Sequence, residues 1–123
     1  MATSRRIYIV DDDSEIISLM TTLLEARGHK VKSNLVGDQA ISEIVEMRPH
    51  CLIVDLMMAA IDGYALTAEL KKYRELADTK IIMVSARTDS IWSEKSHAAG
   101  LDGYITKPID IATFAKRVES FVA

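Results

Sequence analysis

The stretch IYIVDDDSEI, residues 7–16, sets a short apolar run directly against three carboxylates. A nearly continuous run of apolar and β-branched residues is typical of a strand covered on both faces of a parallel sheet. Neighbouring carboxylates repel one another, so a cluster of them costs free energy unless a positive charge offsets it. We therefore expect a cation beside Asp11, Asp12 and Asp13, at the end of this strand.

The composition is that of one globular domain. The chain has 123 residues, of which 49% are hydrophobic, a net charge of -3 and a pI of about 5.6. The acidic balance argues against a nucleic-acid surface, and no stretch resembles a signal peptide or reaches the length of a membrane span. The single cysteine, Cys51, is interpreted as a core residue in a reducing compartment. We expect one domain, residues 1–123, located in the cytoplasm, without nucleic-acid or membrane partners.

Apolar runs alternate with helical patterns along the chain. The sequences RIYIV, KVKSN, CLIVD, KIIMVS and GYIT predict strands at 6–10, 30–34, 51–55, 80–85 and 103–106. Apolar residues at helical spacing follow them, at 16–24, 41–45, 66–73 and 114–122, and the polar segment 89–100 is a further, weaker helix. Gly28, Pro49 and Gly100 are helix stop signals. Five such units predict an α/β fold, a doubly wound five-stranded parallel sheet with helices on both faces.

Side chains that can bind phosphate or its metal ion lie at or just after the ends of several of these strands. Asp11, Asp12 and Asp13 end the first strand, Asp55 the third and Ser85 the fourth, while Lys107 follows the fifth. The carboxyl ends of parallel strands meet at one edge of the sheet. Carboxylates, a hydroxyl and a lysine together suit Mg²⁺ and a phosphoryl group. The three histidines have no metal-ligand spacing and no acidic neighbour in the sequence, so we assign them no role.

Four motifs carry a resemblance to a known family. They are VDDD at 10–13, DLMMAAIDGY at 55–64, VSAR at 84–87 and GYITKP at 103–108. With them the chain resembles, over nearly its whole length, the receiver domain of bacterial two-component response regulators, in a stand-alone form. The resemblance implies a flavodoxin-like fold with strand order 2-1-3-4-5 and a role in phosphorelay signalling.

The resemblance also implies a metal site and a phosphoacceptor. Asp55 would take a phosphoryl group from a phosphohistidine of a sensor histidine kinase or a phosphotransfer protein. Asp11 and Asp12 match the acidic pair that holds Mg²⁺ together with Asp55, with Asp12 the direct ligand. The backbone carbonyl of Met57 would complete the set. The protein would then be a phosphoprotein, catalysing only its own phosphorylation and dephosphorylation.

The remaining matched residues imply a switch. Ser85 matches the hydroxyl that bonds a phosphoryl oxygen, Lys107 the lysine that pairs with it, and Tyr104 the aromatic that turns inward as the hydroxyl moves. The output surface would be the fourth helix, the fifth strand and the last helix, where a downstream protein or a second copy binds. Trp92 in that fourth helix is a candidate contact. The Lys107–Pro108 bond is expected to be cis, and Asp13 to start the first helix.

The chain departs from the family pattern at three positions. Ala59 stands where the family usually has a proline that would fix the loop backbone, so we expect a looser loop with the chemistry retained. Met57 and Arg87 occupy positions that tune dephosphorylation, and neither carries a carboxylate or amide that could orient water.

Two other functions fit parts of the pattern. VDDDS also matches the strand-end motif of haloacid dehalogenase-type phosphatases, with Asp11 as nucleophile and Asp13 as acid. That scheme needs a further acidic pair after the lysine, where only Asp110 follows, and leaves Asp55 without a role. The second alternative is a receiver-like interaction module that is never phosphorylated, which would not need the complete set of site residues.

Overall fold

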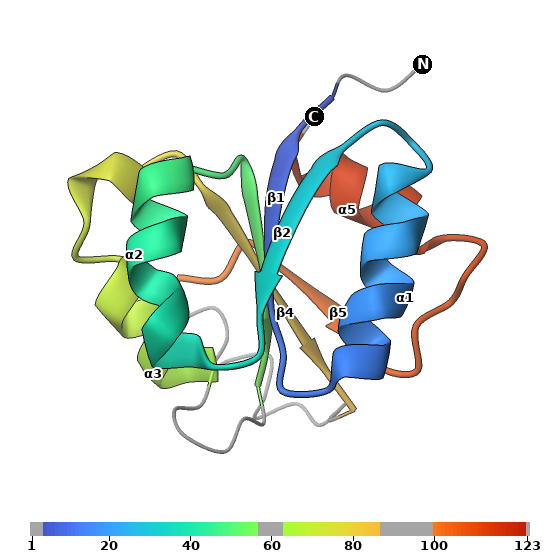
Figure 1. Ribbon diagram of the computed structural model, residues 1–123, viewed down its shortest axis with the longest axis horizontal. Coiled ribbons are helices and arrows are strands. Elements are labelled where there is room, and N and C mark those ends of the chain that lie inside the picture. Colours follow the sequence, from blue (N-terminus) through green and yellow to red (C-terminus); the bar gives the residue numbers. More distant parts are fainter. Residues whose placement is uncertain (1–3, 57–62, 87–99, 123) are drawn as a thin grey trace.

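A computed structural model describes residues 4–56, 63–86 and 100–122 of the chain. Within them, five parallel strands form one sheet in the order β2-β1-β3-β4-β5 (Figure 1). The strands are β1 Arg6–Val10, β2 Lys30–Asn34, β3 Cys51–Asp55, β4 Lys80–Ser85 and β5 Gly103–Thr106. The predicted strand ranges and the doubly wound, flavodoxin-like order are confirmed.

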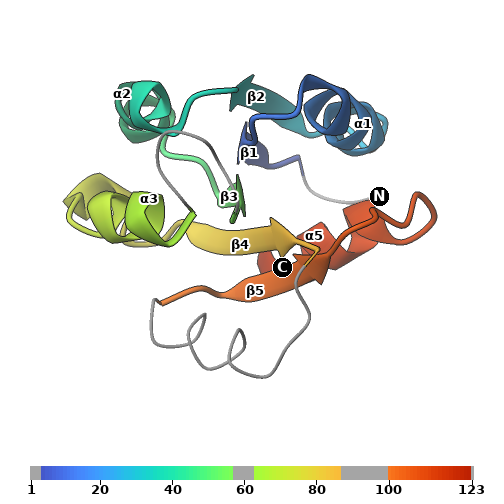
Figure 2. The ribbon, with the colours of Figure 1, turned by 90° about the horizontal axis from the view of Figure 1, so that it is seen from below.

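Helices cover both faces of this sheet. They are α1 Ser14–Glu25, α2 Gly37–Met47, α3 Gly63–Leu70 and α5 Phe114–Val122, with a short 3₁₀ helix, η1, at Arg74–Leu76. Helices α1 and α5 lie on one face and α2 and α3 on the other (Figure 2). The helix predicted at 89–100 lies outside the described residues, apart from Gly100. No helix in the described part of the chain is both long and apolar enough to cross a bilayer.

The alternation of side chains along each strand divides the core in two. On β1, Ile7 and Ile9 face α1 and α5, while Tyr8 and Val10 face α2 and α3, and all four are fully buried. Cys51 is buried in the first of these layers, as predicted. The strands β1, β3 and β4 are covered on both sides, so both layers are apolar there, and this packing holds the carboxyl ends of these strands in a fixed arrangement.

Helix ends follow the predicted signals. The Asp13 carboxylate accepts hydrogen bonds from the backbone N–H of Glu15 (2.9 Å) and Ile16 (3.4 Å), and so caps the start of α1. Gly28 follows α1 with φ +89°, a left-handed conformation that favours glycine. Helix α2 ends two residues before Pro49, as predicted.

One helix is shorter than its sequence pattern predicts. Helix α3 ends at Leu70, so Tyr73 lies beyond it. The backbone N–H of Tyr73 donates to the Leu70 carbonyl (3.1 Å) in a tight turn. The prediction that the helix reaches Tyr73 is wrong. Its spacing from Leu70 satisfies the helical pattern, but Tyr73 is 37% exposed and is not anchored in the core as Leu70 is.

At the amino-end edge of the sheet, His29 has an acidic partner that its sequence neighbours do not reveal. The backbone N–H of Arg5 donates to His29 Nδ1 (3.1 Å), so the opposite ring nitrogen, Nε2, donates to Glu119 of α5 (2.7 Å). Arg27 donates twice to the same carboxylate, at 2.7 and 2.8 Å. Hydrogen bonding by Arg27, and then by His29, outweighs burial and lowers the pKa of Glu119 to about 2. This cluster ties the end of α1 to α5.

Candidate functional site

The strands direct their carboxyl ends toward the lower edge of the molecule in Figure 1, and Figure 2 looks onto that edge. The register of the sheet pairs Asp55 with Val84 and Ser85 with Thr106. The ends of β1, β3, β4 and β5 are therefore neighbours in space. The predicted meeting of these strand ends at one edge is confirmed.

Three carboxylates form a cluster at this edge. Asp11 and Asp55 are 1% and 5% exposed, whereas Asp12 is open to solvent. One oxygen atom from each of the three lies within 4.8 Å of the others. Two buried acids beside one accessible acid form an oxygen-rich donor set that fits a hard divalent cation such as Mg²⁺.

Backbone contacts hold the buried acid Asp11 in place. The N–H of Asp13 donates to Asp11 Oδ1 (2.9 Å), and the N–H of Asp11 donates to the carbonyl of Asn34 at the end of β2 (3.3 Å). Asp13 thus supports the site through its backbone while its side chain caps α1. The sequence predicted the cap but not the backbone support, which depends on the turn geometry after β1.

The cation expected beside the acids is Lys107. Its Nζ lies 3.2 Å from Asp11 Oδ2 and 3.4 Å from Asp55 Oδ1. The lysine is anchored through its backbone, because its N–H donates to the Ser85 carbonyl (2.8 Å) and its bond to Pro108 is cis, as predicted. Burial alone would lower the pKa of Lys107, but the charges of Asp11 and Asp55 outweigh it, so the pKa is raised. Lys107 is therefore held as a cation between the two acids.

The switch candidates lie on β4 and β5. Ser85 ends β4 and is 1% exposed. Tyr104 of β5 is half-buried against the core layer under α2 and α3. Arg117 of α5 donates to the Tyr104 carbonyl (3.0 Å), which links the two elements at the expected output surface. The predictions for Met57, Ala59, Arg87 and Trp92 concern residues outside the described ranges.

The site geometry does not favour the phosphatase alternative. Asp13, which would have to act as the acid, already accepts two backbone hydrogen bonds as the cap of α1. Asp110 similarly accepts from the N–H of Ala112 (2.9 Å) in the turn before α5. Asp55, which that scheme leaves unused, lies in the acid cluster beside Lys107.

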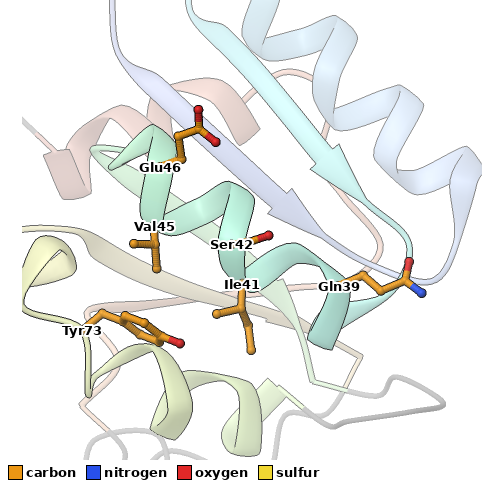
Figure 3. Close-up of a pocket in the computed structure, with 6 residues that line it drawn as sticks. All are labelled: Gln39, Ile41, Ser42, Val45, Glu46 and Tyr73. Atoms are coloured by element: carbon orange, nitrogen blue, oxygen red, sulfur yellow. The ribbon is translucent and has the colours of Figure 1, made fainter.

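A groove lies on the α2 side of the sheet. It has a volume of about 690 Å³ and separates α2 from the turn that carries Tyr73 (Figure 3). Ile41 and Val45 point into it toward the Tyr73 ring, and Gln39, Ser42 and Glu46 line the rest. None of these side chains belongs to the acid cluster.

The fold and site define a receiver module. Residues 7–119 match the family model described as the response regulator receiver domain. The chain belongs to this family, as its four motifs predicted, and its relatives are signalling proteins of two-component systems.

Individual relatives support the same assignment. The chain is 29% identical to protein PilH of Pseudomonas aeruginosa over 96% of this chain and 98% of PilH. It is also 29% identical to RpaA of Synechocystis, a DNA-binding dual master transcriptional regulator, over 95% of this chain but only 48% of RpaA. The chain thus spans about half the length of RpaA and nearly all of PilH. The structure of chemotaxis protein CheY4 of Vibrio cholerae superposes with a TM-score of 0.91 at 21% identity, covering 98% of this chain and 100% of CheY4. At 21% identity, this similarity is evidence for a shared fold and for nothing further.

Proposed function

We propose that the protein relays a signal by accepting a phosphoryl group on Asp55 from a phosphohistidine of a sensor histidine kinase or phosphotransfer protein. The observation that carries the proposal is the position of Lys107 Nζ between Asp11 and Asp55, beside the three-carboxylate cluster. A nucleophilic carboxylate must approach an anionic phosphoryl group, so it needs cations close by. A receiver with this role would work in the cytoplasm, as predicted from the sequence.

The acid cluster is the candidate metal site. Asp11, Asp12 and Asp55 would hold Mg²⁺, with the Met57 carbonyl as the further ligand implied by the resemblance. When bound, Mg²⁺ supplies positive charge that offsets the phosphoryl oxygens. The exposure of Asp12 leaves the site reachable from solvent.

The remaining site residues have separate tasks. An Asp55 carboxylate oxygen forms the bond to phosphorus as the phosphorus–nitrogen bond of the phosphohistidine breaks, and the imidazole leaves. Lys107, held as a cation, pairs with a phosphoryl oxygen, and the Ser85 hydroxyl donates to another. No general base is required, because a carboxylate nucleophile has no proton to lose as it attacks.

We further propose that phosphorylation changes the surface formed by the fourth predicted helix, β5 and α5. Movement of Ser85 toward the phosphoryl group would let Tyr104 turn further inward and bias this surface between two states. A downstream protein, or a second copy of the chain, would recognise one of them. The contact of Arg117 with the Tyr104 carbonyl supports a coupled movement of β5 and α5.

The assignment of Asp55 is tested by intact-mass measurement after incubation with acetyl phosphate and Mg²⁺. We expect one added phosphoryl group on the wild type, and none on Asp55→Asn or in the presence of a chelator. Asp13→Asn is the matched control, because asparagine is also a good helix cap, and it should be labelled like the wild type.

Each alternative predicts a different result. If Asp13→Asn blocks labelling while Asp55→Asn does not, the phosphatase scheme with Asp11 as nucleophile gains support. A wild type that stays unlabelled by acetyl phosphate and by a panel of phosphorylated histidine kinases would support an interaction module instead. Either result would overturn the proposal.

A further inference from the structure

The first residue of α3 lies directly against the backbone that carries the phosphoacceptor. Gly63 donates its N–H to the Leu56 carbonyl (2.9 Å). A Cβ atom at Gly63 would lie 2.7 Å from the Asp55 carbonyl oxygen and 3.0 Å from Leu56 Cα. A Cβ atom essentially never lies within 3.0 Å of a heavy atom beyond its own residue and its chain neighbours. Any side chain here would force a backbone segment to move.

Helix α3 is poorly placed to make room. The Thr67 hydroxyl donates to the Gly63 carbonyl (2.7 Å) inside the protein, which fixes the first turn. Leu66 and Leu70 of the same helix are fully buried in the core layer. Moving α3 outward would open space around these side chains, and cavities in a close-packed core are costly.

The strand is anchored up to the point of contact. Strand β3 pairs with β1 on one side and with β4 on the other, and Leu56 N–H extends the second ladder by donating to the Val84 carbonyl (3.2 Å). The sheet pairs β1 with β3 only as far as Val54. The peptide between Asp55 and Leu56 is held to β4 through the Leu56 N–H but lies beyond the last β1–β3 pair, so its carbonyl would take up the displacement.

We propose that Gly63 is a positioning residue for the phosphoacceptor. By having no side chain, it lets α3 begin against the Asp55–Leu56 peptide and so sets the backbone from which the Asp55 carboxylate reaches Lys107 and the metal ligands. The inference builds on the proposed function. Displacements of about 1 Å at a reacting group can reduce rates by about a hundredfold, so a small shift here is sufficient to matter.

A second contact allows the backbone effect to be separated from simple crowding. The same Cβ would lie 2.6 Å from Met83 Sδ of β4. Met83→Ala removes that overlap but leaves the overlap with the Asp55 carbonyl. Gly63→Ala combined with Met83→Ala therefore isolates the contact with the phosphoacceptor backbone.

Gly103 supplies the matched control. A Cβ there would lie 2.5 Å from the Phe121 ring, a distance as short as those at Gly63, but the overlap is with a side chain and lies between β5 and α5. Gly103→Ala should therefore lower stability by crowding without touching the Asp55–Leu56 peptide. Comparing the two alanine variants distinguishes a local effect on the site from a general loss of packing.

The test has two measurements on each folded variant. Backbone amide NMR shifts monitor a titration with Mg²⁺, and mass spectrometry gives the rate of labelling by acetyl phosphate. For Gly63→Ala, alone and with Met83→Ala, we expect Mg²⁺ affinity and labelling rate to fall about tenfold or more. The amide resonances of Asp55 and Leu56 should shift even without metal. Gly103→Ala should keep the wild-type Mg²⁺ affinity.

Thr67→Val is a milder variant in case Gly63→Ala does not fold. Loss of the hydroxyl frees the first turn of α3, and we expect Mg²⁺ affinity to fall about two- to tenfold, the scale of one hydrogen bond. Wild-type Mg²⁺ affinity in folded Gly63→Ala, or in Thr67→Val if the former is unfolded, would overturn the proposal. So would full recovery in the double variant, which would assign the effect to Met83. A wild type that binds Mg²⁺ but is not labelled would contradict the proposed function and still leave the Mg²⁺ comparison decisive.

Discussion

At the scale of single residues, Lys107 stabilises the folded protein even when no phosphoryl group is bound. It neutralises two buried carboxylates, Asp11 and Asp55, that would otherwise face each other in the low-dielectric end of the sheet. The same positive charge repels a divalent cation bound by Asp11, Asp12 and Asp55 and so lowers the affinity for it. Metal-free stability and metal affinity should therefore change in opposite directions when the lysine is removed.

Lys107→Met tests this balance. We expect the free energy of unfolding without metal to fall by about 1–3 kcal/mol, less than the roughly 3–5 kcal/mol for a fully buried pair. The lower value reflects the partial exposure of the Lys107 side chain, 21%. Mg²⁺ should stabilise the variant more than the wild type, because one repelling charge is gone. Urea unfolding with and without Mg²⁺ measures both effects.

Asp12→Ala is the matched control for that experiment. Asp12 is exposed, so its loss relieves crowding of like charges and should not lower metal-free stability. The stabilisation by Mg²⁺ should disappear. A Lys107→Met variant that is as stable as the wild type without metal would show that the lysine does not offset the buried acids.

At the scale of elements, the link between α1 and α5 depends on one carboxylate. Glu119 accepts from Arg27 and from the buried ring of His29, far from the acid cluster at the opposite edge of the sheet. Its folded pKa of about 2 lies below the ordinary value of 4.5. The contribution of Glu119 to stability is therefore complete above pH 4.5 and is lost as the pH falls through about 2.

Glu119→Gln should reveal this dependence. The variant should be less stable than the wild type at pH 7, and the difference in unfolding free energy should shrink steadily between pH 4.5 and 2. Denaturant unfolding of both proteins across that range provides the measurement. A difference that stays constant with pH would mean that the carboxylate charge does not stabilise the α1–α5 contact. Labelling of Asp55 should be unaffected, since Glu119 and its partners lie at the opposite edge of the sheet from the acid cluster.

The elements also show what the sequence could and could not predict. Strand ranges such as that of β3 were predictable because the run CLIV, residues 51–54, is apolar throughout, and the strand-end acids and Lys107 followed from the topology. The partner of His29 was not, because Glu119 is 90 residues away in the chain. The role of Gly63 depends on clearances between α3 and β3 that no local pattern encodes. Tyr73 fitted the helical period of α3 but not its packing.

At the scale of the whole molecule, the candidate site and the proposed output surface share β5. Lys107 follows β5 directly, its backbone is bonded to Ser85 of β4, and Tyr104 lies three residues earlier on the same strand. A phosphoryl group on Asp55 would give Lys107 a stronger anionic partner. Any shift of the lysine would then be passed along β5 to Tyr104, and through its carbonyl to Arg117 of α5.

Hydrogen exchange should detect this coupling. On addition of acetyl phosphate and Mg²⁺, we expect altered amide exchange across residues 88–106 and in the first turns of α5. Asp55→Asn should show no such change under the same conditions. Changes confined to α1 would place the output surface elsewhere on the molecule. Arg117→Ala should weaken the response in α5 while leaving the labelling of Asp55 intact.

The outer position of β2 also has a consequence for behaviour at high concentration. Among the described strands it has one neighbour, β1, and it carries Lys30 and Lys32 exposed to solvent. Unpaired strand edges are templates on which other chains polymerise, and lysines on them oppose it. If β2 of a second molecule paired with this edge, its lysines would lie beside these lysines and repel them. If an apolar strand paired there, its side chains would lie beside unpaired charges. Replacing both lysines by threonine would keep the strand but remove that protection, and the chain should then form fibrous aggregates at concentrations where the wild type stays dispersed.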